Sequence, residues 1–173
     1  MITEALRGDL TRWRGLGAET LDSVTEALAP VQSVVGPTYA ERRRGAFDTY
    51  TLARSEPPGE IVIWLPAGDA VVALIECDNP PVPDPDAVLE DLGVPEEVQH
   101  NQRFRTGVLV DEWAYPARGL NLSVATPHDH VGADPAPGGV RAVVHLQLFR
   151  PMSLDDWRAA LGAAVPLRPF PLG

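Results

Sequence analysis

The sequence contains no lysine and a single cysteine, Cys77, and both scarcities narrow what the protein can be. One cysteine cannot form an intrachain disulfide, so the sequence does not indicate an oxidising compartment. All 14 basic side chains are arginine, a bias typical of GC-rich bacterial genomes, and 24 acidic side chains outnumber them to give a formal net charge of −10. Nucleic acids and anionic membranes attract basic proteins, so this charge argues against both as partners and favours a basic protein partner. The alternative is that the acidic charge only keeps the protein soluble.

Long apolar runs are absent as well. No segment approaches the ~18 consecutive apolar residues that a membrane-spanning helix requires. Residues 1–17 lack the basic start and apolar centre of a signal peptide. We therefore expect a cytoplasmic protein. Its length of 173 residues and hydrophobic share of 45% suit a single domain with its own core.

Helices are predicted where apolar residues recur every three or four positions, and strands where apolar residues alternate or run together between Gly and Pro turns. The predicted helices cover residues 3–14, 19–29, 85–92 and a segment that starts at Ser153. The predicted strands cover residues 47–54, 60–65, 69–76, 108–115, 118–125 and 140–149. In the fifth of these strands, Asn121 and Ser123 alternate with leucine and valine, which predicts one exposed face.

The two halves of the chain show the same order of segments. Each half has a helical segment followed by three strands, and the middle strand of each triplet ends in proline, at Pro66 and Pro127. We predict an α+β protein whose antiparallel sheet of about six strands comes from two tandem helix-plus-three-strand units, with the helices packed on one face. The halves are residues 1–77 and 87–173, joined by a proline-rich linker at 78–86, and they form one compact domain.

This order of segments, with the turns VGP at 35–37 and LGVP at 92–95, resembles the beta-lactamase inhibitor protein class and the small outer-membrane assembly lipoproteins of related shape. The resemblance implies the tandem architecture and a sheet that binds other proteins. It assigns no binding residue to this chain. Members of those families are exported, and the inhibitor class carries disulfides, which the single cysteine here does not permit.

One loop gathers residue types that bind metals. His128, Asp129, His130 and Asp134 supply imidazole and carboxylate groups within seven positions, and transition metals take such ligands. The segment follows a proline and lies in a glycine- and proline-rich loop, where a solvated polar role is the alternative. The sequence therefore offers a metal-binding loop as one hypothesis and predicts no cofactor elsewhere.

The most distinctive segment is DEWAYPARGL, residues 111–120. Trp113, Tyr115 and Arg118 belong to the residue types that dominate protein interfaces. Trp113 and Tyr115 share one side of their predicted strand. They are the candidate partner-binding residues, and the alternative is that both rings pack under the helices as core.

Motifs that would fix a reaction are missing: the chain has no phosphate-binding loop with its Lys and Ser/Thr and no GxSxG nucleophile motif. We therefore predict a non-enzymatic protein-binding module, an inhibitor or immunity-type protein acting on a basic partner. The alternatives are a metal-binding protein or metal-assisted enzyme built on the loop of His128 to Asp134, and a structural subunit of a larger bacterial assembly.

Overall fold

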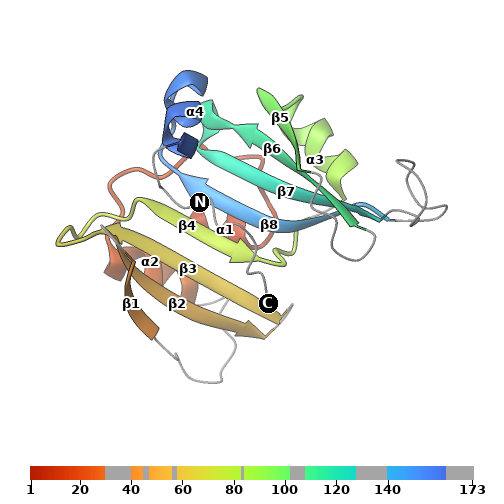
Figure 1. Ribbon diagram of the computed structural model, residues 1–173. Helices are drawn as coiled ribbons and strands as arrows, with labels where there is room; N and C mark the ends of the chain where they lie inside the picture. The colour runs from red at the N-terminus through yellow and green to blue at the C-terminus, as the bar shows by residue number, and fades with distance from the viewer. Residues whose placement is uncertain are drawn as a thin grey trace.

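The computed structural model describes residues 1–29, 40–44, 47–55, 58–82, 84–101, 108–127 and 140–162. Within these residues the protein is α+β, with one antiparallel sheet and helices before, between and after its strands (Figure 1). The strands are β1 (Ala40–Arg44), β2 (Phe47–Ser55), β3 (Pro58–Pro66), β4 (Leu74–Asp78), β5 (Glu97–Asn101), β6 (Val108–Tyr115), β7 (Leu120–Pro127) and β8 (Ala142–Phe149). The helices are α1 (Ile2–Leu6), α2 (Leu21–Leu28), α3 (Pro85–Leu92), the short 3-10 helix η2 (Pro116–Arg118) and α4 (Leu154–Gly162).

The strand order across the sheet is β1-β2-β3-β4-β8-β7-β6-β5. Each half of the chain forms a meander, and the two meanders meet at β4 and β8, where Glu76 lies opposite Gln147. The prediction of an α+β protein with an antiparallel sheet is confirmed, but the described sheet has eight strands and each half supplies four. The two extra strands are the edges β1 and β5. Their sequences, AERRR and EVQHN, have almost no apolar residues, so no apolar pattern marked them.

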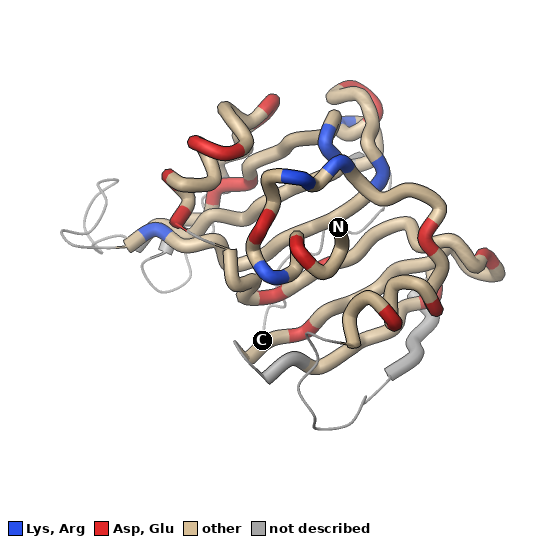
Figure 2. The backbone as a smooth tube through the Cα atoms, turned by 180° about the vertical axis from the view of Figure 1, so that it is seen from behind, with Lys and Arg blue, Asp and Glu red and all other residues tan. Residues whose placement is uncertain are grey.

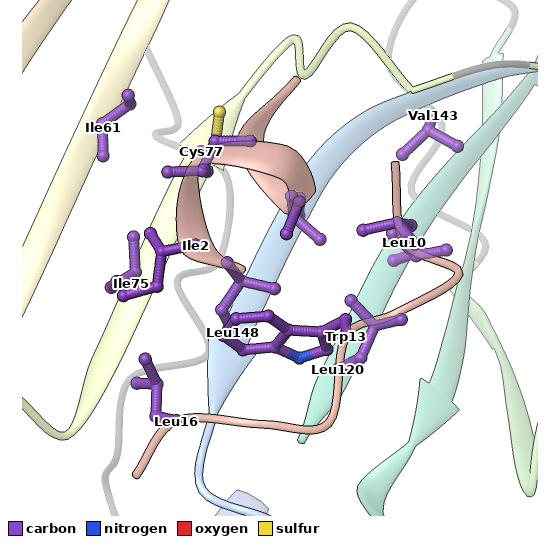
Figure 3. Packing of buried hydrophobic residues seen from close by; sticks show 14 of the residues in the cluster. Ile2, Leu10, Trp13, Leu16, Ile61, Ile75, Cys77, Leu120, Val143 and Leu148 are labelled. Carbon is purple, nitrogen blue, oxygen red and sulfur yellow. The ribbon is translucent and has the colours of Figure 1, made fainter. Parts of the chain in front are cut away.

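One face of the sheet carries the main core. Helices α1, α2 and α3 cover this face, and their buried residues join those of the central strands in one cluster (Figure 1). Trp13 is 1% exposed, and its indole N–H donates to the backbone oxygen of Gly119 at 3.1 Å. Figure 3 shows side chains from the N-terminal segment, β3, β4, β7 and β8 converging on this layer. Burial of this apolar area is the dominant favourable term in folding.

The opposite face is covered differently, and here the prediction that all helices pack on one face is wrong. Trp157 of α4 clusters with Val62, Trp64 and Phe149. Val62 and Trp64 alternate along β3 with Ile61 and the other residues of the main core, so they point to the other side of the sheet. Helix α4 therefore packs on the face that α1, α2 and α3 leave open.

The first helix is shorter than predicted. It ends at Leu6 rather than near residue 14, because Gly8 adopts φ +94°, a left-handed conformation. A Cβ atom at Gly8 would lie 2.1 Å from the carbonyl oxygen of Pro81, so the chain turns here against the segment that precedes α3. Leu10 and Trp13 are still buried, and the helical spacing thus identified core residues although they are not helical. Within the described residues, no helix combines the length and the apolar character needed to cross a membrane.

Candidate functional site

The residues predicted to bind a partner lie mostly inside the protein. Trp113 and Tyr115 are 4% and 3% exposed and belong to the main core cluster. The guanidinium of Arg141 lies 5.1 Å from the Trp113 ring centre, and the Tyr115 hydroxyl donates to the backbone oxygen of Gly93 at 3.0 Å. Burial raises the pKa of Tyr115 to about 12, slightly offset by the nearby positive charge of Arg118. As they lie, both rings serve the core, and partner contact by them stays a prediction.

Trp113 and Tyr115 support the segment that runs from the end of α3 into β5, at the edge of the sheet. Gly93, which accepts the Tyr115 hydrogen bond, ends α3, and Val98 of β5 lies opposite Trp113. The carboxylate of Glu96 accepts a hydrogen bond from the backbone N–H of Ala117, next to the partly exposed Arg118, at 2.9 Å. Residues 84–101 are thus tied to β6 and η2 at several points.

We call residues 84–101 the acidic edge. It contains six carboxylates and no arginine, and Figure 2 shows acidic positions spaced along α3. Five of the six are exposed: Asp84, Asp86, Glu90, Asp91 and Glu96. Strand β5 forms the outer rim of the described sheet and pairs with β6 on its inner side.

The carboxylates of the acidic edge differ in their partners. Asp86 pairs with Arg141 at 3.2 Å, and Glu97 pairs with Arg158 of α4 at 2.6 Å. Hydrogen bonds from the Gln99 amide and from Arg158 lower the pKa of Glu97. Glu90 and Asp91 have no ion-pair partner among the described residues, so their charge faces solvent.

Exposed apolar side chains accompany this charge. Val94 is 86% exposed and Val98 is 37% exposed, two of the four large hydrophobic side chains that stand out from the described surface. Single exposed apolar residues are ordinary. Here Val94 lies between α3 and β5, and Val98 lies within β5, the edge strand of the described sheet. An exposed sheet edge is the feature that protein recognition by strand addition uses.

A second site lies on the sheet face opposite α1, α2 and α3. We call it the buried polar band, and its members are Trp64, Glu76, Glu112, Asn121, Ser123 and Gln147. Asn121 and Ser123 are each 2% exposed, so the prediction that β7 has one exposed face is wrong. The alternating pattern is present, but its polar side chains contact protein groups rather than water.

Hydrogen bonds connect the buried polar band across five strands. The Glu76 carboxylate accepts from the Trp64 indole at 2.7 Å and from the Gln147 amide at 3.1 Å. The Asn121 amide donates to Gln147 at 3.1 Å and more weakly to Glu112 at 3.4 Å. Glu112 also accepts from Ser123 at 2.8 Å. Buried polar groups are stable where they are bonded in this way.

The strand register brings these residues together. Glu76, Gln147 and Asn121 lie opposite one another in successive strands, and Ser123 lies between His145 and Glu112 in the next row. The register shifts between Ser123 and Val124. As a result, Val143 lies on the face covered by α1, α2 and α3, and His145 lies on the face of the buried polar band. His145 Nε2 lies 3.6 Å from Asp78 and 4.0 Å from Glu76.

The buried polar band was not predicted, although the sequence contains a signal for it. Glu76 and Gln147 each interrupt a run of apolar residues, in the strands LIECD and AVVHLQLF, and they face each other across the junction of the two halves. One atom of the band, Oδ1 of Asn121, is buried without a hydrogen-bond partner in the described structure.

The predicted metal ligands His128, Asp129, His130 and Asp134 lie outside the described residues. Within the part of the chain that the structure describes, no group of three or more His, Cys, Asp or Glu side chains is arranged to hold a metal ion. Cys77 is free of disulfide and fully buried in the main core.

Comparison with known proteins gives no match: no protein-family model, no curated protein and no solved structure is significantly similar to this chain.

Proposed function

We propose that this protein is a non-enzymatic binding module for a basic protein partner and that the acidic edge is the surface it uses. The observation that carries the proposal is the coincidence of three features in residues 84–101. These are an edge strand of the described sheet, the exposed carboxylates of Glu90 and Asp91, which have no ion-pair partner among the described residues, and the exposed valines Val94 and Val98.

Each feature supplies a different part of recognition. The outer side of β5 offers backbone donors and acceptors to an extended segment, which gives affinity by strand addition. Val94 and Val98 supply apolar area beside that strand. Glu90 and Asp91 attract positive charge and speed association, an effect that falls as salt rises. The partner segment is accordingly extended, basic and partly apolar.

The test is affinity capture from lysate of the source cell, repeated with paired variants. Glu90→Gln with Asp91→Asn removes two charges from the acidic edge. Asp22→Asn with Glu26→Gln removes two exposed charges from α2 and serves as the matched control. We expect one basic protein to be retained by the wild type and the α2 control, and lost from the α3 variant at moderate salt. Equal retention by all three proteins contradicts the proposal.

A second candidate function is a subunit of a larger assembly, and the two ends of the sheet favour it. Strand β1, at the rim opposite to β5, has the sequence AERRR, so the two edges differ in charge. Copies joined edge to edge in a head-to-tail manner could extend without closing. Sedimentation velocity over a range of protein concentrations tests this. Oligomers whose sedimentation coefficient rises with concentration, and which dissociate when salt is added, support assembly. A single monomer peak at all concentrations contradicts it.

A further inference from the structure

A pocket of about 380 Å³ lies on the same sheet face as α4. The turn between β3 and β4, the end of β8 and α4 enclose it. Its described lining is mainly aromatic and aliphatic, including Phe47, Leu74, Phe149, Met152 and Trp157. Ligand sites in proteins are typically concave, apolar cavities of about 300–1,000 Å³ with a few polar groups.

The floor of the pocket is apolar in effect. Gln147 lines it, but its oxygen accepts from Asn121 and its nitrogen donates to Glu76. A ligand therefore gains little by hydrogen bonding there and is held by contact with the aromatic and aliphatic walls. The buried polar band fixes Gln147, and this keeps the floor in place without an occupant.

The rim carries two charged residues of opposite sign. Arg150 is exposed and forms no ion pair with any described carboxylate. Asp69 already accepts a hydrogen bond from the backbone N–H of Val71 at 3.1 Å, within its own turn. Arg150 is therefore the charged residue at the rim that has no ion-pair partner among the described residues. The planar N–H donors of its guanidinium match the geometry of a carboxylate.

Size limits the ligand further. A volume of about 380 Å³ lies at the small end of the range found for ligand pockets. One aromatic ring with a short acidic chain fits this space.

We propose that this pocket binds a small apolar carboxylate, with its ring against Phe149 and Trp157 and its carboxylate at Arg150. The proposal goes beyond protein binding and does not depend on it, since the pocket and the acidic edge share no residue.

The test uses three probes that share one skeleton: 4-phenylbutyrate, its neutral amide 4-phenylbutyramide and the cation 4-phenylbutylamine. Binding to the purified full chain is followed by Trp fluorescence and by NMR. For a ligand of this size we expect a dissociation constant of roughly 1 mM or tighter for the acid. Because exposed ion pairs contribute little, the acid should bind only about three- to fivefold more tightly than the amide.

Two variants on neighbouring positions of α4 supply the control. Ala160 lines the pocket and Ala159 is exposed beside it. Ala160→Phe should abolish binding of the acid, whereas Ala159→Phe should leave it unchanged. Arg150→Gln, at an exposed position that will not disturb folding, should remove the preference for acid over amide. Binding that survives Ala160→Phe, or no binding by any probe at millimolar concentration, overturns the site, and preference for the amine overturns the carboxylate.

Discussion

The protein uses carboxylates in two contrasting regions. In the buried polar band, Glu76 is 2% exposed and accepts hydrogen bonds from Trp64 and Gln147. On the acidic edge, Glu90 and Asp91 face solvent and pair with no described cation. The first arrangement fixes strands of both halves to one another, because a buried acceptor is stable only while its donors stay in place. The second stabilises little and leaves charge available to another molecule.

The difference shows that the number of acidic residues does not tell whether a given carboxylate contributes to stability or to binding. A carboxylate inside the sheet specifies register, and its removal leaves its donors unsatisfied. A carboxylate on the surface is nearly neutral for stability, so a function for it has to be sought in binding. Substitutions in each region separate the two roles.

Glu76→Leu should be the most damaging change. It removes the acceptor of the Trp64 indole and of the Gln147 amide, and each buried donor left unbonded costs about 1–3 kcal/mol. We expect the free energy of unfolding to fall by about 3 kcal/mol in urea denaturation. Glu90→Leu is the control and should change it by less than ~0.5 kcal/mol. Equal losses for the two variants would erase the contrast.

Gln147→Leu should cost about 2 kcal/mol, because Glu76 and Asn121 each lose a partner. Asn121→Leu in the same protein should add less than its separate cost, since both residues belong to one network. A double-mutant cycle by chemical denaturation should give a coupling energy of at least ~0.5 kcal/mol. Strict additivity would mean that the buried polar band is a set of independent bonds.

Arg158→Gln should change the acidic edge by raising the pKa of one group, the Glu97 carboxyl. Gln99 and Arg158 lower the pKa of Glu97 below its ordinary value of 4.5. A lowered pKa stabilises the fold above about pH 4.5, and this contribution is lost as the pH falls through the lowered value. In the variant, NMR titration should show the pKa of Glu97 rising part of the way to 4.5, because the Gln99 bond remains. An unchanged pKa would remove Arg158 as a cause.

Val94→Asn should have the smallest effect on stability. The side chain is 86% exposed, so we expect a change within ~0.5 kcal/mol. The same variant should retain less of a captured basic partner, because apolar area beside β5 is lost. Thermal unfolding and capture measured on one preparation separate these outcomes, and a variant that unfolds early without losing the partner would assign Val94 to stability instead.

The sequence predicted the regular parts of this fold for physical reasons that hold locally. The sequence predicts a helix over residues 85–92 that Gly93 ends, and α3 has these bounds. Strand β6 was likewise placed at residues 108–115. The unbroken apolar run IVIWL at residues 61–65 predicts a strand buried on both faces, and all five residues are buried in β3.

Features that depend on distant segments could not be read in this way. Alternation along β7 cannot distinguish water from Glu112 as the partner of Ser123, because Glu112 reaches it from another strand. The end of α1 depends on the approach of Pro81 to Gly8, which lies far away in the sequence. The edge strand β5 exists because β6 pairs with it, and its own residues carry no apolar pattern.

Hydrogen exchange at β5 in the presence of a basic peptide tests directly whether the acidic edge binds a basic, extended segment. A short peptide of alternating lysine and valine is added to the full chain, and a glutamate–valine peptide serves as the control. We predict that the outward-facing amides of residues 97–101 exchange more slowly when the lysine–valine peptide is present, but not when the glutamate–valine peptide is present. The double substitution Glu90→Gln with Asp91→Asn should weaken this protection. Slowed exchange elsewhere, with the amides of β5 unaffected, would contradict the acidic edge as the binding surface.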